Sequence, residues 1–396
     1  MSAHILIAGG GIGGLAAALA LARHGHRVTV LERHPQFTEL GAGIQLAPNA
    51  FAALDQLGVG DEVRRRAVFI DELRLMDGTT GKLVAAMPLA RRYRERFGNP
   101  YVVVHRNDLY QPLLSACRHL PDVELRAGAA VTGYEQDGAG VTVRLESGER
   151  PRGDALIGAD GIRSAVRRHV VGDGEPRVSG HTIYRSLIPM RLVPDDLRWN
   201  TVTLWAGPRC HFVHYPVSEG EFLNLAAVRD DGASEVVVGR PTERQHVLSQ
   251  FEQMSDVARR LLELGAEWRS WVLCDRDPAP AWTQGRVTLL GDAAHPMLQY
   301  AAQGACMALE DAVMLGTVFA GTCGDLSRRL ADYQAARLHR TARAQLISRG
   351  MTELYHSAGP DAVHRNEMLS GLSADQMYER VSWLHGGPGV SQDEPG

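Results

Sequence analysis

Residues 4–32 read HILIAGGGIGGLAAALALARHGHRVTVLE, a pattern that predicts a strand, a glycine-rich turn, a helix and a second strand. His4–Ala8 is a short apolar run, Leu15–His24 carries apolar residues at helical spacing, and Arg27–Glu32 is a second strand-like run. Gly25 follows the helix, at a place where glycine is the favoured residue. Strand, helix and strand in this order form a βαβ unit, so we expect a parallel sheet.

The turn of this unit has the spacing G-x-G-x-x-G at Gly9, Gly11 and Gly14. Glycine there lets the turn form, lets the backbone approach a pyrophosphate and lets the helix pack closely on the strand. The helix N-terminus offers free N–H groups and a partial positive charge to phosphates. Glu32 ends the second strand, where its carboxylate can accept both ribose hydroxyls of an adenosine. A tight turn without a ligand is the alternative. The residues expected to contact the dinucleotide here are Gly9, Gly11, Ile12, Gly14, Glu32 and Arg33.

The composition of the 396-residue chain is that of a globular protein, with 44% apolar and 22% charged residues. Its net charge of −4 provides no basic field for nucleic acid. The five cysteines are scattered without a CxxC pair, which favours a reducing compartment, the cytoplasm, and argues against disulfides and a cysteine-rich zinc site. Glycines interrupt the apolar N-terminal run, so we expect neither a signal peptide nor a membrane span.

Two kinds of pattern alternate along the rest of the chain. Buried strands followed by helices or tight turns recur at Val102–Leu120 and Asp154–Gly161. Val123–Leu156 contains short alternating runs that predict antiparallel strands. Between Gly180 and Asp277, runs such as TVTLWAG and RCHFVHYPV indicate a second, antiparallel sheet. The order of these elements implies two modules that exchange the chain more than once.

We therefore expect an α/β fold, in which a Rossmann-like cofactor domain is interleaved with a smaller α+β substrate domain that contains the antiparallel sheet. The expected cofactor domain comprises residues 1–70, 100–179 and 278–345, and the substrate domain comprises residues 71–99 and 180–277. Residues 346–396 are expected to form a C-terminal helical segment and a disordered tail.

Two further motifs place an acidic residue at the end of a predicted strand. Asp160, in IGADGIRSAVR, could hydrogen-bond ribose hydroxyls, water or backbone N–H groups; capping of the following helix is an equally open alternative. Asp292, in GRVTLLGDAAH, could bind a sugar or ribityl hydroxyl, and the helix after Gly304 would point its positive end at an acceptor. An ordinary loop and core helix is the alternative for this second motif.

The chain closely resembles the single-component FAD-dependent aromatic hydroxylases of the para-hydroxybenzoate and salicylate hydroxylase type. The resemblance is carried by three motifs that occur in this order: GGGIGG with Glu32, IGADGIRSAVR and GRVTLLGDAAHPMLQYAAQGACMALEDA. The likeness extends from His4 to about Arg340. It implies FAD as a tightly bound cofactor and NADH, or NADPH, as a co-substrate that docks transiently at the surface. Many relatives have glycine directly before the Gln-Gly pair, where this chain has Ala302.

The resemblance also implies a place for each cofactor-side residue. The adenosine would lie along Gly9–Glu32, with Asp160 near the pyrophosphate and Asp292 near the ribityl chain. Arg106, in HRNDL, matches the family arginine beside the flavin. The helix that begins at Gly304–Ala305 would point at the pyrimidine edge of the flavin, where the reduced form carries its negative charge.

Within this family, GPRCHFVHYP, CDRDPAPAW and GDAAHPMLQYAAQGA look like the enzymes that convert 3-hydroxybenzoate to gentisate. This likeness implies that His211, Tyr215 and Gln299 surround the reacting ring and that Tyr101 is a further pocket residue. Residues 211, 213 and 215 share one face of a strand, so His211 and Tyr215 can reach one cavity beside Val213.

The expected reaction gives these residue types a purpose, because loss of the phenolic proton enriches the ortho and para carbons of the ring in electrons. A histidine near its solution pKa suits proton acceptance, and Gln299 would orient the hydroxyl or carboxylate. The strand pattern alone leaves open a core histidine at His211, a packing role for Tyr215 and a helix cap at Gln299. His214 points to the opposite face, where we expect it to be exposed.

We therefore expect a monooxygenase that uses NAD(P)H and O₂ to hydroxylate a phenolic acid through a flavin C4a-hydroperoxide, with para hydroxylation of 3-hydroxybenzoate favoured. The alternative substrates are salicylate, hydroxynicotinate or a natural-product phenol. The alternative classes are a flavin-binding protein without hydroxylase activity and a plain NAD-dependent dehydrogenase. The expected partners are the aromatic acid, O₂ and a second copy of the chain in a homodimer, without nucleic acid, membrane or metal.

Overall fold

The computed structural model describes residues 2–38, 41, 43–320 and 325–387. It contains the predicted βαβ unit: β1 (His4–Ala8) and β2 (Arg27–Leu31) pair in parallel, and α1 (Ile12–Arg23) connects them. Both strands are almost fully buried, as expected for a parallel sheet that is covered on its two faces.

A six-stranded sheet with the order β19-β20-β12-β1-β2-β8 grows outward from this unit. The added strands are β8 (Val123–Arg126), β12 (Ala155–Gly158), β19 (Thr283–Gln284) and β20 (Val287–Leu289). All neighbours are parallel except β19 and β20. The prediction of antiparallel strands throughout Val123–Leu156 is therefore wrong for β8, because alternation along a half-exposed edge strand does not specify the direction of its partner.

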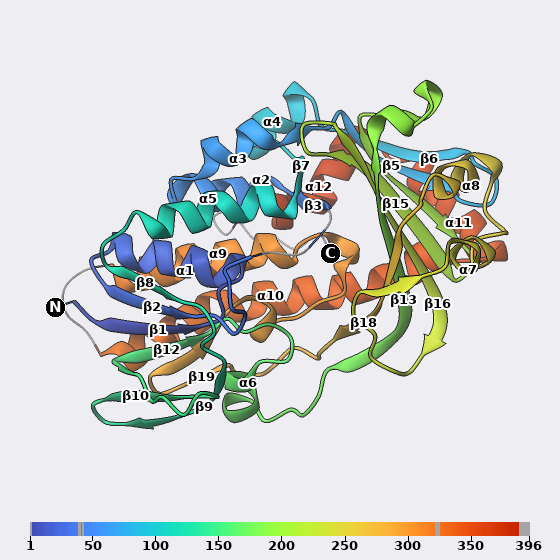
Figure 1. The fold of residues 1–396 in the computed structure, drawn as a ribbon. Coiled ribbons are helices and arrows are strands. Elements are labelled where there is room, and N and C mark those ends of the chain that lie inside the picture. The colour runs from blue at the N-terminus through green and yellow to red at the C-terminus, as the bar shows by residue number, and fades with distance from the viewer. Residues whose placement is uncertain (1, 39–40, 42, 321–324, 388–396) are drawn as a thin grey trace.

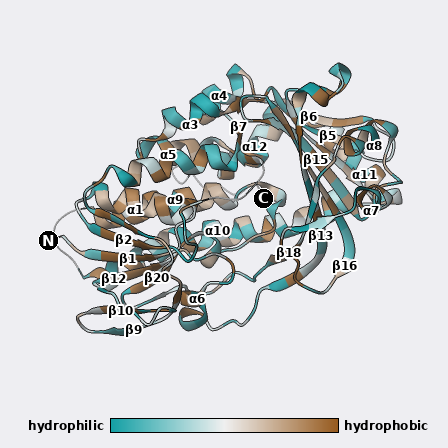
Figure 2. Ribbon diagram, viewed as in Figure 1, coloured by the Kyte–Doolittle hydropathy of each residue, from teal (hydrophilic) through white to brown (hydrophobic). Residues whose placement is uncertain are grey.

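Helices pack on one side of this sheet (Figure 1). α1 packs against α5 and α9, and nearly all of its residues are buried, so its apolar residues surround the whole helix. Figure 2 shows hydrophobic residues concentrated in α1, α9 and the central strands, and mainly hydrophilic residues in the outer helices α3 and α4. This part of the molecule contains the helices α2 (Pro48–Gln56), α3 (Gly60–Arg66), α4 (Arg91–Phe97), α5 (Arg106–Arg118), α6 (Ala165–Val170) and α9 (Gly304–Phe319).

Two small antiparallel sheets accompany the large one. The first has the order β11-β10-β9 and the second the order β3-β7-β4. Their strands are β3 (Gly43–Leu46), β4 (Val68–Phe69), β7 (Val102–His105), β9 (Val131–Asp137), β10 (Gly140–Leu145) and β11 (Arg152–Gly153).

The second large sheet has eight strands, in the order β17-β18-β13-β16-β15-β14-β5-β6. All pairs are antiparallel except β14 with β5. Its strands are β5 (Glu72–Asp77), β6 (Leu83–Pro88), β13 (Arg177–Pro189), β14 (Thr201–Gly207), β15 (Cys210–Val217), β16 (Phe222–Ala233), β17 (Arg240–Thr242) and β18 (Trp268–Asp275). The short helices α7 (Arg244–Ser249) and α8 (Asp256–Glu263) help to enclose the apolar cluster beside it.

The chain continues through α10 (Leu326–His356), α11 (Gly359–Ser370) and α12 (Ala374–His385). α10 runs without a break across the predicted domain limit at residue 345, so the C-terminal segment begins inside a helix that also packs on the cofactor side. The division into domains stays a prediction, and the expected disordered tail lies mostly outside the described residues. None of the helices in the described part of the chain combines the length and apolarity of a membrane span.

A buried ion network joins α9 to α10. The Arg337 guanidinium donates to Asp311 Oδ1 and to Glu310 Oε2, each at 2.6 Å, and Arg340 donates to both oxygens of Glu310 at 2.7 and 2.8 Å. His295 Nε2 lies 2.6 Å from Asp311 Oδ2. Although burial opposes ionisation of Asp311, His295 and Arg337 lower its pKa to about 2. This network therefore carries paired charges in the protein interior.

Replacement of Arg337 by methionine should destabilise the protein strongly, because two buried carboxylates would lose a shared cation. We expect a loss of about 3–5 kcal/mol in the free energy of unfolding, measured by urea denaturation. The control is Arg150→Met, since Arg150 and its partner Glu135 are each more than half exposed; it should cost less than about 1 kcal/mol. Equal effects of the two substitutions would contradict a structural role for the network.

Candidate active site

A cavity of about 920 Å³ lies between the glycine turn and the eight-stranded sheet. All the predicted substrate-side residues line it, namely Tyr101, His211, Val213, Tyr215 and Gln299. The predicted cofactor-side residues that line it are Gly11, Ile12, Arg106, Asp292, Gly304 and Ala305. Gly9, Gly14, Glu32, Arg33 and Asp160 are not among the lining residues. The two halves of the predicted site thus share one cavity, and its cofactor end includes only part of the first two motifs.

The glycine turn is tight at two positions and open at the third. A Cβ at Gly14 would lie 2.0 Å from the Gly9 carbonyl oxygen, and one at Gly9 would lie 2.3 Å from the Ala159 oxygen. Gly9 also has a φ of +104°, which side-chain-bearing residues rarely adopt. A Cβ at Gly11 would meet nothing within 4 Å, and this residue lines the cavity. The turn thus exposes its backbone at Gly11, as the approach of a phosphate requires.

Glu32 shapes this turn through its own hydrogen bonds. Its Oε2 accepts from the Gly10 N–H at 2.7 Å, and its Oε1 accepts from the His34 N–H at 2.8 Å. Arg33 is exposed. The contact of Glu32 and Arg33 with an adenosine ribose therefore stays a prediction.

Asp160 adopts the alternative that the sequence left open. Its Oδ2 accepts from the backbone N–H groups of Ala165 at 2.7 Å and Val166 at 3.3 Å, so it caps α6. Its Oδ1 is buried and has no protein partner among the described residues. The neighbours Ala159 and Gly161 line the cavity. An orphaned acceptor beside an open glycine turn fits a nucleotide or its bound water, so these residues fit FAD.

The third motif forms two short turns before α9. Asp292 lies in the first, at Gly291–Ala293, and a Cβ at Gly304 would lie 3.8 Å from Asp292 Oδ1, so the carboxylate lies close to the start of α9. His295 is fully buried, and its Nε2 lies 2.6 Å from Asp311 Oδ2, which ties this turn to α9. Ala302 has a left-handed φ of +53°. Glycine is favoured there, since a Cβ in this conformation costs about 1 kcal/mol. This preference agrees with the glycine of the family pattern and makes Ala302 a strained position.

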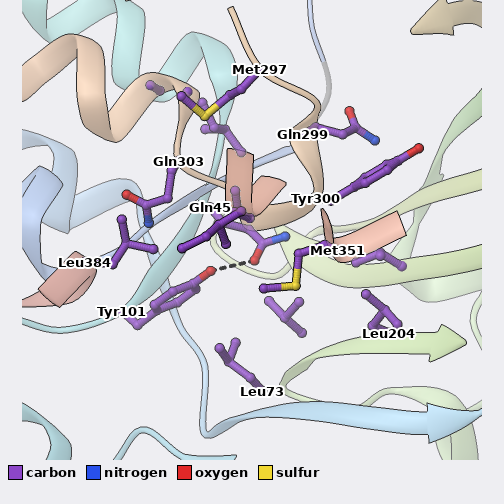
Figure 3. Close-up of a pocket in the computed structure, with 18 of the residues that line it drawn as sticks. Gln45, Leu73, Tyr101, Leu204, Met297, Gln299, Tyr300, Gln303, Met351 and Leu384 are labelled. Atoms are coloured by element: carbon purple, nitrogen blue, oxygen red, sulfur yellow. Dashed lines mark hydrogen bonds between the residues drawn. The ribbon is translucent and has the colours of Figure 1, made fainter. Parts of the chain in front are cut away.

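The substrate end of the cavity is built on β15, where residues 211, 213 and 215 all line the cavity, as period two predicts. Burial raises the pKa of Tyr215 to about 12, so its hydroxyl stays protonated. Tyr101 donates a hydrogen bond of 2.7 Å to Gln45 Oε1, which Figure 3 shows in the middle of the cavity. Gln45 was not expected from the sequence.

The expectation that His211 has a pKa near its value in solution is wrong. Its side chain is 2% exposed, and burial lowers its pKa well below the usual 6.5, with further lowering by His356 and His181. Its Nδ1 is hydrogen-bonded to His356 Nε2 at 2.8 Å. His211 is therefore a neutral imidazole at neutral pH, and only its Nε2 remains for a ligand in the cavity.

The expected exposure of His214 is also wrong. Its ring is fully buried on the opposite face of β15 and stacks on Phe212 and Trp205. Burial lowers its pKa to about 3. The second face of β15 packs against an apolar cluster, which the alternation of polar and apolar residues could not reveal.

Besides Gln45, lining residues on β13, on the turn before α9 and on α12 were not predicted from the sequence. Arg185 of β13 lines the cavity, and its NH2 donates to Gln299 Oε1. Tyr300 lines it and bonds His181 Nδ1 through its hydroxyl at 2.6 Å. The C-terminal helix α12 contributes further lining residues, and Figure 3 shows Leu384 near Tyr101 and Gln303. A lone arginine within the apolar strand TIYRSLIP was the available signal for Arg185. The apolar side of residues 371–386 indicated a packing or dimer helix at α12 but did not show what it packs against.

Known proteins share this architecture. The chain superposes on Klebsiella pneumoniae HpxO complexed with FAD and uric acid with a TM-score of 0.86, at 27% identity and 97% coverage of both chains. It superposes on a salicylate hydroxylase substrate complex with a TM-score of 0.83, at 26% identity, covering 97% of this chain and 95% of the other.

Closer relatives are found among proteins compared by sequence. The chain is 50% identical over 387 residues to 3-hydroxybenzoate 6-hydroxylase 1 of Aquipseudomonas alcaligenes, with 98% of each chain covered. It is 44% identical over 382 residues to 3-hydroxybenzoate 6-hydroxylase of Polaromonas naphthalenivorans, covering 96% of this chain and 95% of the relative.

Substitution of Gly11 by valine should abolish FAD retention without unfolding the protein. The backbone of Gly11 has φ −75°, which valine adopts, but the new side chain would occupy the open end of the cavity. We expect the FAD content after gel filtration to fall by about tenfold or more, in keeping with loss of a phosphate contact, at unchanged circular dichroism. Gly138→Val, at an exposed glycine with open space around it, is the control; full FAD content in both variants would contradict the assignment.

A match to a protein-family model agrees with a cofactor site at the glycine turn. A family model described as FAD binding domain matches residues 2–348, which includes the glycine turn, Asp160 and the turns before α9. Three features of the structure agree with FAD binding: the glycine turn at Gly9, Gly11 and Gly14, which we call the glycine cradle, the unpartnered Oδ1 of Asp160 and the cavity beside them. The chain belongs to the FAD-binding-domain family of flavoprotein aromatic hydroxylases.

Proposed function

We propose that this enzyme hydroxylates 3-hydroxybenzoate at the carbon para to its hydroxyl group, giving gentisate, with NADH and O₂ as co-substrates. The names of the relatives at 44–50% identity support this substrate. FAD, when bound, would take two electrons from NADH and use them to activate O₂. The protein side of the reaction depends on how the cavity holds a small aromatic acid.

The observation that carries the proposal is the Arg185 guanidinium, which is partly buried in the cavity wall and has no acidic partner among the described residues. Burial lowers the pKa of Arg185, and its ionisable neighbours are Tyr215 and Arg106. Among the described residues no carboxylate forms a salt bridge with Arg185, and its Nε is buried without a partner. A buried charge is costly unless it is paired. The carboxylate of an aromatic acid would provide the missing partner, and two oxygens suit the guanidinium fork.

Arg185 and His211 lie on the same face of the eight-stranded sheet. Arg185 and Val213 are both in register with Ala226 of the strand between them, β16, so the three side chains share a face. His211 is two residues from Val213 on β15 and therefore points the same way. We propose that Arg185 binds the carboxylate and His211 the phenolic hydroxyl, since two anchors fix the ring in its plane and so select the carbon that reacts.

The walls between these anchors are apolar. Leu73, Leu204 and Met351 line the cavity, and Figure 3 shows them on the side that faces the sheet strands, opposite Met297 and Gln303. Apolar walls accept the faces of an aromatic ring and exclude water. Tyr215 stays protonated, so its hydroxyl can donate to a developing phenolate. We propose that Gln299, which accepts from Arg185, holds that guanidinium toward the ligand.

A screen of monohydroxybenzoates tests the function. We expect 3-hydroxybenzoate to stimulate NADH oxidation by the FAD-loaded enzyme and to be converted to gentisate, identified by chromatography against standards. NADPH in parallel assays should be the poorer reductant. Faster turnover of 2- or 4-hydroxybenzoate, or of 6-hydroxynicotinate, would replace the proposed substrate. NADH oxidation that responds to no phenolic acid would exclude hydroxylase activity.

Substitution of Arg185 by glutamine tests the carboxylate anchor. We expect kcat/KM for 3-hydroxybenzoate to fall by about 10- to 100-fold, the worth of a charge-assisted hydrogen bond. 3-Hydroxybenzyl alcohol, which has no carboxylate, is the matched control substrate, and its kcat/KM should change little. An equal fall for both compounds would show that Arg185 acts on folding or on the cofactor and not on the carboxylate.

We also propose a homodimer. α10 and α11 expose large apolar side chains, namely Leu346, Val363 and Met368, whose exposed fractions are 52%, 56% and 42%. Large apolar side chains exposed on neighbouring segments of the chain favour association when a partner covers them. Sedimentation of the holoenzyme as a single species of one chain mass would contradict it.

A further inference from the structure

The cavity histidine is connected to a second histidine at the far end of the longest helix. His211 Nδ1 lies 2.8 Å from Nε2 of His356, the last residue of α10. His211 is 2% and His356 9% exposed. A hydrogen bond between two imidazole nitrogens holds one proton, so one ring donates while the other accepts. The contact therefore couples the tautomers of the two rings.

The second histidine leads toward the surface. His356 Nδ1 is buried and has no partner among the described residues. Single ligand atoms of His356, His181 and Asp230 all lie within 4.8 Å of one another. Asp230 is partly exposed and forms a salt bridge of 3.2 Å with the exposed Arg209. The groups His211, His356 and Asp230 therefore form a series from the cavity to solvent.

Two tyrosines lie against the His211 ring, one from the turn Gln299–Ala301 and one from α10. The centroid of the His211 ring lies 4.8 Å from that of Tyr300, in an edge contact, and 5.2 Å from that of Tyr355. Burial raises the pKa of both tyrosines, so neither is an anion near His211. The other groups that act on His356 are His181 of β13, Asp230 and Arg229 of β16, and Arg209 before β15. Asp230 is the acid of this set, and it faces the outer end of the series.

The two histidines are poor terminal proton acceptors. Burial lowers the pKa of His211 far below 6.5, and burial together with His181 lowers that of His356 to about 4. Neither ring would keep an added proton at neutral pH. A series of rings can nevertheless pass a proton on, because each imidazole accepts at one nitrogen and releases at the other.

We propose that His211 and His356 form a proton relay through which the substrate's phenolic proton leaves the cavity toward Asp230 and solvent. This inference rests on the proposed function, in which His211 meets the phenol. His356 touches no reacting atom and is a relay and positioning residue that acts through His211. The ligand atoms near His356 thus serve proton transfer and not a metal ion in this proposal.

Each proton that leaves one group in the relay is accepted by the next group. The phenol O–H bond breaks as a bond to His211 Nε2 forms, and the proton on His211 Nδ1 moves to His356 Nε2. The proton on His356 Nδ1 then moves to water, and through it to Asp230 or solvent, because a gap of up to 4.8 Å is too long for a direct hydrogen bond. The phenolate remains in the cavity, both rings end as neutral tautomers, and no electrons are transferred. Protonation of the product hydroxyl reverses these steps and restores the starting tautomers.

The test compares His356→Phe with the wild-type holoenzyme. Phenylalanine preserves a ring in the packing but removes both nitrogens. The absorbance of phenolate is followed by stopped flow as 3-hydroxybenzoate binds, over a range of pH. We expect phenolate formation to slow by about 10²-fold, the lower end of general acid–base effects, with substrate Kd changed less than about threefold. The pH at which half of the bound substrate is phenolate should rise toward the value of a free phenol, about 10.

Two further variants separate the relay from a packing role. His356→Ala should regain part of the rate when imidazole is added, since free imidazole can occupy the space and bridge His211 to Asp230. His214→Phe replaces a buried histidine on the opposite face of β15, outside the cavity, and should leave the rate unchanged. A folded, FAD-loaded His356→Phe enzyme that forms phenolate at the wild-type rate and pH would overturn the relay alone. A wild-type enzyme that hydroxylates no phenolic acid would overturn the proposed function as well.

Discussion

The buried charges at Glu310–Asp311, Arg337 and Arg340 are the interaction on which the rest of the structure depends. Charges this deep in a protein are tolerated only when each is paired and hydrogen-bonded. The partners come from three segments: α9, α10 and, through His295, the turn that carries Asp292. Asn49 of α2 adds a hydrogen bond of 2.7 Å to Glu310. The network therefore fixes the middle of α9 relative to three other segments.

The same network reaches the end of the chain. Arg340 donates to the carbonyl oxygens of Trp383 and Leu384, at the C-terminal end of α12. Tyr93 of α4 bonds His385 Nδ1 at 2.7 Å. These contacts hold α12 against the cavity, where Figure 3 shows Leu384 beside Tyr101. A segment far from the glycine turn in sequence thus becomes a wall of the site that the turn helps to form.

In the proposed function the two ends of the cavity bind their ligands by different means. At the FAD end the recognition groups are backbone atoms and small residues, so glycine spacing reports them directly. At the substrate end they are long side chains, Arg185, His211 and Tyr215, from two strands of the eight-stranded sheet. Their meaning depends on burial: the same residues on an exposed strand would be ordinary polar surface. Short-range sequence spacing therefore indicates the FAD end of the cavity, whereas the substrate end depends on how the strands pack.

The sequence alone determined the βαβ unit, the glycine cradle and the face shared by His211, Val213 and Tyr215, because each follows from short-range spacing and backbone geometry. Only the tertiary structure decided that Asp160 caps α6, that His214 is buried and that His211 is neutral and bonded to His356. Those outcomes depend on contacts between residues as far apart as positions 211 and 356. Desolvation and pairing are set by what packs around a group, and no local pattern in the chain specifies those neighbours.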